Sequence, residues 1–194
     1  ADIILIDWIE KAGVVDFILG EKTSAILKSS EKAIFLTNIT KPLVSHNKII
    51  VLIPPLSEME NGFSLLMEKS SKLANELSIP LMIFCNQKTQ KALKTMFTKN
   101  RWHATTKYEY FEDWEDFLVL SRFIDVTDMI ILISSRRGTV SYFQQVEIIP
   151  NKVKKYYPEN NFIICFPKLN SQQELTHIGN VDLNAPGVIN TGIE

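Results

Sequence analysis

Apolar residues along most of this chain fall into short runs that alternate with segments of helical periodicity. Four runs of four to six residues have the length and continuity of strands buried on both faces of a sheet, and one further segment alternates apolar with polar residues. The five strands expected from these patterns are Lys48–Ile53, Pro80–Cys85, Thr105–Tyr110, Met129–Ile133 and Phe162–Phe166.

The segments between these strands carry apolar residues at intervals of three and four, as helices with one buried face do. The expected helices cover Phe63–Leu77, Thr89–Phe97, Trp114–Phe123 and Val146–Tyr156, with Pro150 interrupting the last near its start. Regular alternation of strand and helix predicts an α/β fold with a five-stranded parallel, flavodoxin-like sheet covered by helices on both faces. The expected strand order for residues 48–166 is 3-2-1-4-5, with right-handed crossovers.

The first 40 residues repeat the end of this pattern. Two apolar runs, Ile3–Ile6 and Ala33–Leu36, flank an expected helix at Phe17–Lys28, just as Met129–Ile133 and Phe162–Phe166 flank the last helix. We interpret residues 1–40 as the C-terminal remnant of a first, similar module. A linker at 41–47, a second module at 48–168 and an extended or disordered tail at 169–194 complete the expected organisation.

The last strand of the second module would have an open edge, whose free N–H and C=O groups favour pairing with another strand. We therefore expect Ala33–Leu36 to lie antiparallel beside Phe162–Phe166, within the chain or across a dimer. Ile3–Ile6 should extend the same sheet. Apolar surface left bare by the incomplete first module should promote self-association.

Composition narrows the function classes. With 194 residues, 45% of them apolar and 22% charged, the chain can form an ordinary globular domain. Its formal net charge of −1 gives no general attraction to nucleic acid, so no nucleic-acid partner is expected. No apolar stretch of about 20 residues is present. The chain opens on Ala1-Asp2 without a starting Met, and we expect it to be a fragment of a longer polypeptide.

Cysteine and histidine offer little chemistry in this sequence. Cys85 and Cys165 each close an apolar run and are expected to be buried, reduced thiols. His46, His103 and His177 are isolated from any nucleophile motif, and no zinc-type spacing occurs, so neither catalytic residues nor a metal site are expected.

The candidate ligand site is the segment that follows the fourth strand of the second module, at the carboxyl end where open α/β sheets bind ligands. Its polar side chains suit a phosphate group; the alternative is a solvated loop with two surface arginines. The candidate residues are Ser134, Ser135, Arg136, Arg137, Gly138, Thr139 and Ser141, together with Pro54 after the first strand.

An acidic run offers a second, weaker candidate. Its carboxylates suggest a cation site, but a charged helix start explains them better, with Asp113 as the N-cap. The residues of the run are Glu109, Glu112, Asp113, Glu115 and Asp116.

Five further motifs stand out along residues 1–168. They are Val15-Asp16-Phe17-Ile18-Leu19-Gly20, Asn47-Lys48-Ile49-Ile50-Val51-Leu52-Ile53-Pro54-Pro55, Glu58-Met59-Glu60-Asn61-Gly62-Phe63, Asp113-Trp114-Glu115-Asp116-Phe117 and Ser134-Ser135-Arg136-Arg137-Gly138-Thr139-Val140-Ser141. With this α/β pattern, the chain resembles the universal stress protein family. More narrowly, through these motifs it resembles the cytosolic tail of bacterial monovalent cation:proton antiporters of the second cation-proton antiporter family, which carry two such modules after their membrane domain.

The resemblance also sets an expectation about nucleotides. ATP-binding members of the family carry an Asp after the first strand and a spaced set of glycines after the fourth, which let backbone N–H groups close on phosphates. Here Pro54 takes the Asp position, Gly138 fits the first glycine, Ser141 takes the second, and Asn151-Lys152 take the last pair. In the N-terminal segment, Gly13 and Gly20 have the wrong spacing. No cofactor, and no tight binding of ATP, is therefore expected.

The resemblance implies a non-catalytic regulatory domain on the cytoplasmic side of an inner-membrane antiporter, which senses an anionic or nucleotide ligand. Its expected partners are the preceding module and the membrane transport domain of the same polypeptide, and a second copy in a homodimer. The first alternative is a stand-alone universal stress protein that binds nucleotides. The second is a small α/β enzyme such as a nucleotide hydrolase, which the absence of an acid–base or nucleophile motif disfavours.

Overall fold

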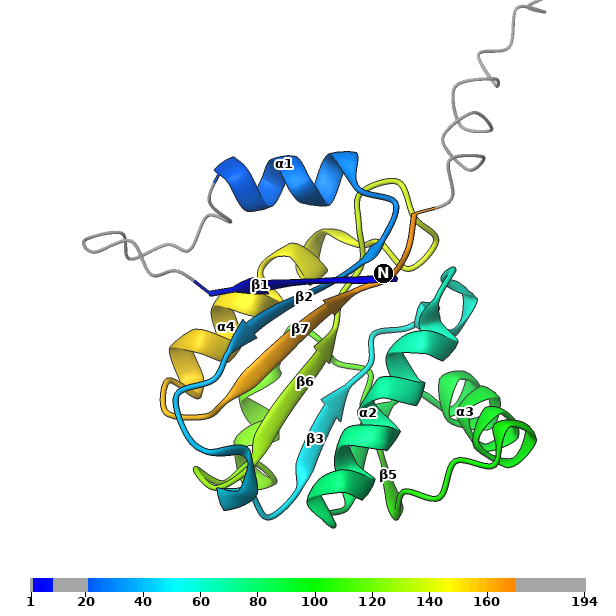
Figure 1. Cartoon of the computed structure of the whole chain (residues 1–194), viewed down its shortest axis with the longest axis vertical. Coiled ribbons are helices and arrows are strands. Elements are labelled where there is room, and N and C mark those ends of the chain that lie inside the picture. Colours follow the sequence, from blue (N-terminus) through cyan, green and yellow to red (C-terminus); the bar gives the residue numbers. More distant parts are fainter. Residues whose placement is uncertain (1, 9–20, 170–194) are drawn as a thin grey trace, which may run out of the picture.

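A single mixed sheet organises the part of the chain that the computed structural model describes, residues 2–8 and 21–169 (Figure 1). Within these residues the sheet has seven strands in the order β1-β2-β7-β6-β3-β4-β5, and every neighbouring pair is parallel except β2 with β7. The strands are β1 (Ile3–Asp7), β2 (Ala33–Asn38), β3 (Ile49–Leu52), β4 (Leu81–Cys85), β5 (Thr106–Tyr110), β6 (Met129–Ile133) and β7 (Phe162–Phe166).

The strand order predicted for residues 48–166 is confirmed, because β7-β6-β3-β4-β5 is the order 3-2-1-4-5 read from the other side. Residues 48–166 contribute five of the seven strands, and β1 and β2 supply the other two. The predicted antiparallel pairing occurs within the chain, with Leu36 opposite Ile164, and β1 extends the sheet beyond β2. The fold is therefore an α/β fold with a mostly parallel, seven-stranded sheet.

Four α-helices lie on the two faces of this sheet among the described residues. Figure 1 shows α2 and α3 on one side of the strands and α4 on the other. The α-helices are α1 (Glu21–Ser29), α2 (Phe63–Leu77), α3 (Gln87–Asn100) and α4 (Ile149–Tyr156); the 3-10 helices are η1 (Leu43–Ser45), η2 (Ser57–Met59), η3 (Phe117–Arg122) and η4 (Gln144–Glu147). The first four residues of the expected Phe17–Lys28 helix and nearly all of the expected tail lie outside the described residues.

Two apolar cores follow from the alternation of side chains along the strands. Ile50 and Leu52 of β3 point into one core, which also contains Val153 of α4, whereas Val51 points into the other core with Leu66 of α2. All five side chains are fully buried. The central strands are therefore covered on both faces, as their continuous apolar sequences predict.

The expected helix at Trp114–Phe123 is wrong: the segment forms the 3-10 helix η3, which begins only at Phe117. Its buried residues recur at intervals of three, at Trp114, Phe117 and Leu120, which matches the three residues per turn of a 3-10 helix. Leu118, which an α-helix with Trp114 and Phe117 on its buried face would also bury, is 52% exposed. In α4, Pro150 lies in the first turn, where its missing N–H costs no helical hydrogen bond.

The first prediction concerns the antiparallel contact between β2 and β7. Replacing the fully buried Ile164 by Ala removes packing in the middle of the sheet, so the free energy of unfolding should fall by about 2–5 kcal/mol. Urea unfolding followed by circular dichroism measures this loss. The matched control is Val44→Ala, because Val44 is 84% exposed and its truncation should change stability by less than about 0.5 kcal/mol. Equal effects of the two substitutions would contradict the assigned burial of Ile164 in this contact.

Candidate functional site

The site predicted from the sequence lies where β3 and β6 end side by side. The chain leaves β3 towards β4 on one side of the sheet and leaves β6 towards β7 on the other, so the order of connections reverses between these two strands. Such a reversal opens a crevice at the carboxyl ends of the strands, which is the usual ligand site of open α/β sheets. Two loops flank it, residues 53–62 after β3 and residues 134–143 after β6.

A tight turn shapes the loop after β6. The Thr139 N–H donates to the Arg136 carbonyl oxygen at 3.2 Å, and Gly138 at the third position has φ of +84°. A turn with positive φ at that position requires glycine or a similarly permissive residue. Gly138 is thus explained by backbone geometry, without a phosphate contact.

Arg136 is buried, although the sequence suggested a surface residue or a phosphate ligand. Its guanidinium donates to three backbone carbonyl oxygens at the end of α1 and just beyond it, those of Leu27 at 2.9 Å and of Ser30 and Lys32. Burial lowers the pKa of Arg136 to about 10, so the group is still charged at neutral pH. The side chain therefore caps α1 and fastens it to the loop after β6.

The neighbouring Arg137 behaves differently. It is exposed and forms a two-pronged ion pair with Glu147 of η4, in which Nη2 lies 2.9 Å from Oε2. The carboxylate raises the pKa of Arg137, and the guanidinium in turn lowers the pKa of Glu147. An exposed pair of this kind contributes little to stability.

A contact across the crevice joins the two loops. One oxygen of Glu60, Oε1, accepts hydrogen bonds from the Ser141 backbone N–H at 2.7 Å and from the Ser141 hydroxyl at 2.6 Å. Both residues are buried. Sequence reasoning named Ser141 but missed Glu60, although the quoted Glu58-Met59-Glu60 motif placed an acidic residue in the loop after β3.

The structure places the other predicted site residues around this contact. Pro54 is buried at the start of the loop after β3, and Ser134 continues the ladder by donating its N–H to the Cys165 carbonyl oxygen at 2.8 Å. The buried Ser135 hydroxyl has no hydrogen-bond partner within the described ranges, and neither does the buried Ser57 hydroxyl on the opposite loop. The predicted residues thus gather at the carboxyl ends of β3 and β6.

A cavity of about 360 Å³ adjoins the crevice and brings in the acidic run. Glu112, Asp113 and Glu115 line it together with Ser141. Asp113 does not cap an α-helix, because its Oδ1 accepts the N–H groups of Glu115 and Asp116, both at 3.1 Å, and thereby holds a turn before η3. The eleven residues that line the cavity include three carboxylates and no Lys or Arg.

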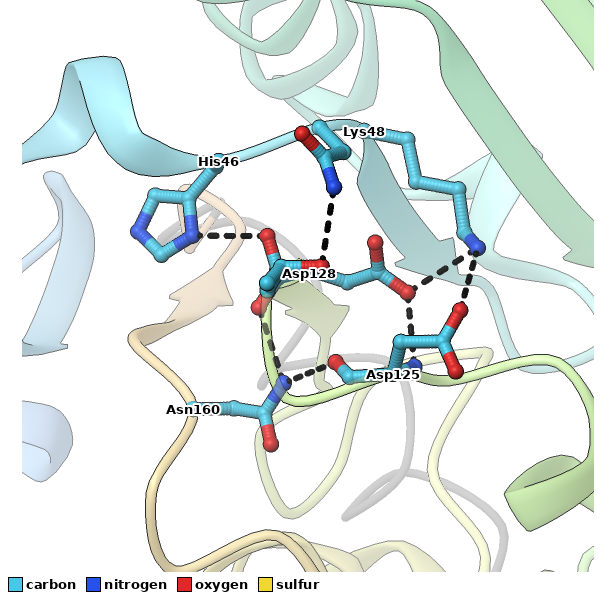
Figure 2. Close-up of polar contacts among 7 residues, drawn as sticks. His46, Lys48, Asp125, Asp128 and Asn160 are labelled. Carbon is cyan, nitrogen blue, oxygen red and sulfur yellow. Dashed lines mark hydrogen bonds and ion pairs between the residues drawn. The ribbon is translucent and has the colours of Figure 1, made fainter.

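A buried polar network lies at the other end of β3 and β6, where these strands begin, and part of it is drawn in Figure 2. Asp128 is 1% exposed and accepts hydrogen bonds from the Lys48 ammonium at 3.0 Å and the Asp125 N–H at 2.7 Å. The Asn160 amide donates to the carbonyl oxygens of Asp125 and Asp128. Because these charges and amides satisfy one another, the network is structural.

His46 belongs to the same network, and its neighbours fix its tautomer. Asn161 Oδ1 accepts the N–H groups of Thr40 at 2.8 Å and Lys41 at 3.0 Å, so its amide nitrogen must be the donor towards His46 Nε2 at 2.8 Å. His46 Nδ1–H then donates to the Thr127 carbonyl oxygen at 3.1 Å. The ring holds the 41–47 segment in place.

The part of the chain that the structure describes contains no group of three or more His, Cys, Asp or Glu side chains that could hold a metal ion. Within the same residues, no helix combines the length and apolar character that crossing a membrane requires. Burial and the nearby Glu58 carboxylate raise the pKa of Cys85 to about 12, and burial also raises the pKa of Cys165.

The second prediction follows from these two buried thiols. At pH 8 the native chain should react with Ellman's reagent much more slowly than a free thiol, because the reagent needs an accessible thiolate. Both Cys85 and Cys165 should react once guanidinium chloride unfolds the chain. The absorbance of the released chromophore at 412 nm measures this, and rapid labelling of either thiol without denaturant would contradict the assigned burial.

Known proteins resemble this chain in fold only. No family model and no curated protein sequence matches it. Among solved structures, a candidate universal stress protein from Pseudomonas aeruginosa UCBPP-PA14 is similar at a TM-score of 0.53 and 11% identity, over 86% of this chain and 63% of that one. A protein of unknown function from Pseudomonas aeruginosa PAO1 is similar at a TM-score of 0.54 and 10% identity, with the same coverage. This chain thus spans less than two thirds of each, and its fold is universal stress protein-like.

Proposed function

We propose that this chain is a non-catalytic regulatory domain of a cation:proton antiporter, on the cytoplasmic side of an inner membrane. In this proposal an anionic or nucleotide ligand binds at the loop after β6, and its presence is transmitted to the N-terminal β1-α1-β2 segment. The observation that carries the proposal is the contact of Arg136 with the end of α1.

Arg136 couples two parts of the chain that the sequence separates by more than 100 residues. The buried guanidinium holds three carbonyl oxygens, so a shift of its loop must either move α1 or leave these groups without partners. A ligand that favours one arrangement of the loop would therefore also favour one position of α1. This is the form that coupling between a ligand site and a distant partner takes.

The N-terminal segment also supports the proposed partners. β1 is an edge of the described sheet, and its Leu5 is 71% exposed on the face where Phe35 and Cys165 lie beside it. An apolar side chain exposed on an edge strand is suited to contact with further protein. We propose that the remainder of a preceding module covers this face and links it to the membrane transport domain. A homodimer is a further proposed assembly.

The third prediction tests the coupling. In Arg136→Ala, the carbonyl groups of Leu27, Ser30 and Lys32 lose charged donors, and local stability of α1 should fall by about 2 kcal/mol. Hydrogen–deuterium exchange of the α1 amides should then be at least about ten-fold faster, while exchange in β3 and β4 should not change.

The matched control is Arg137→Ala, which removes the same charge one residue later and breaks the exposed ion pair with Glu147, but removes none of the contacts of Arg136 with α1. It should leave α1 exchange unchanged. If both variants accelerate exchange in α1 equally, or if neither does, the proposed coupling through Arg136 is wrong.

The alternative, a stand-alone nucleotide-binding protein, also fits the universal stress protein-like fold. The coding region upstream of Ala1 distinguishes the two, because an antiporter requires about ten apolar spans of about 20 residues there. Turnover of ATP by the purified chain would instead favour the second alternative, a small α/β enzyme.

The fourth prediction concerns ATP. Pro54 takes the position of the acidic residue in ATP-binding members of the resembled family, and the Ser141 N–H already donates to Glu60. We expect a dissociation constant for ATP weaker than about 100 µM, or about −5.5 kcal/mol. Isothermal titration calorimetry measures it, and low-micromolar binding would favour the stand-alone nucleotide-binding protein.

A further inference from the structure

Glu60 is the one acidic side chain among the described residues that lies buried between the loops flanking the β3–β6 crevice, where it accepts hydrogen bonds across to the loop after β6. Its Oε1 accepts from the backbone N–H and the hydroxyl of the same residue, Ser141. These two donors, a main-chain N–H and a hydroxyl on one loop, are the kind that bind oxygens of phosphate and carboxylate groups.

Four other polar side chains on these two loops are unpaired or are bonded elsewhere. The hydroxyls of Ser57 and Ser135, on the same two loops, are buried without a hydrogen-bond partner in the described part of the chain. The arginines of the loop are committed elsewhere, Arg136 to α1 and Arg137 to Glu147. The N–H and hydroxyl of Ser141 thus form a position for an oxyanion, and the Glu60 carboxylate of the same chain occupies it.

We propose that Glu60 is a built-in competitor that sets the affinity and specificity of this position. Its carboxylate stands where one oxyanion group of a ligand would bind, so that an external anion must displace it from Ser141. This inference rests on the proposed function, because it specifies which ligands the loop after β6 accepts. Displacement would also separate the two loops that Glu60 now joins.

The displacement explains how the ligand could act on Arg136. Glu60 fixes Ser141, and Arg136 lies five residues earlier on the same loop, joined to Thr139 by the turn at Gly138. Release of Ser141 from Glu60 therefore frees the end of the loop whose beginning holds α1. Binding of a ligand would therefore move the loop, because the ligand would replace Glu60 as the partner of Ser141.

The fifth prediction uses inorganic phosphate as the probe. Glu60→Ala empties the position and should bind phosphate at least about ten-fold more tightly than the unchanged chain, as measured by calorimetry and by the rise in Tm with phosphate concentration. The matched control is Glu58→Ala. Glu58 lies two residues earlier and accepts from the Thr89 hydroxyl at 2.7 Å, so its loss changes the net charge equally without touching Ser141.

A second pair of variants protects the test against misfolding. Glu60→Gln keeps the size of the side chain but accepts hydrogen bonds less strongly than a carboxylate, so it should show a smaller gain than Glu60→Ala and a larger one than Glu58→Gln. Phosphate binding that is no tighter in the Glu60 variants than in the Glu58 variants would overturn the inference. That outcome leaves the exchange test of Arg136 unaffected, so the two proposals fail separately.

Discussion

The antiparallel contact between β2 and β7 is the constraint on which the rest of the arrangement depends. It joins two sets of parallel strands that run in opposite directions, so the carboxyl edge of one set is the amino edge of the other. Asn38, at the end of β2, lies opposite Phe162, at the start of β7. The chain therefore leaves β2 at the same edge where β3 begins, and the short 41–47 segment does not cross the sheet. Trp8 packs edge-on against Phe162, with the two ring centroids 5.0 Å apart, and reinforces this contact.

The same reversal explains the position of Arg136. Because β2 starts where β7 ends, with Ile34 opposite Phe166, the helix that precedes β2 ends at the carboxyl edge of the second set of strands. The loop after β6 leaves the sheet at that edge. A long side chain from the loop consequently meets carbonyl groups at the end of α1 and just beyond it, where the chain leaves acceptors that need donors. If β2 were parallel to β7, the end of α1 would lie at the other edge, out of reach of Arg136.

The strands and their order could be predicted from the sequence, because buried parallel strands read as continuous apolar runs and connection rules restrict their order. The contacts of the site could not. Arg136 lies 109 residues from Leu27, and Ser141 lies 81 residues from Glu60, so no local pattern links them. Sequence reasoning identified Arg136 and Ser141 by residue type and place after a strand. It could not show that groups of the same chain occupy them, which depends on the long-range packing.

Three side chains of the loop after β6 are already bonded within the chain, and this bears on how a ligand could act there. Arg136 binds carbonyl groups, Arg137 binds Glu147, and Ser141 binds Glu60. A ligand entering the crevice exchanges hydrogen bonds within the chain for hydrogen bonds to itself, so its net binding energy is the difference between the two sets. Such an exchange disfavours tight binding of a nucleotide. It suits a switch, because a ligand of modest affinity can interconvert two arrangements that differ by only a few kcal/mol.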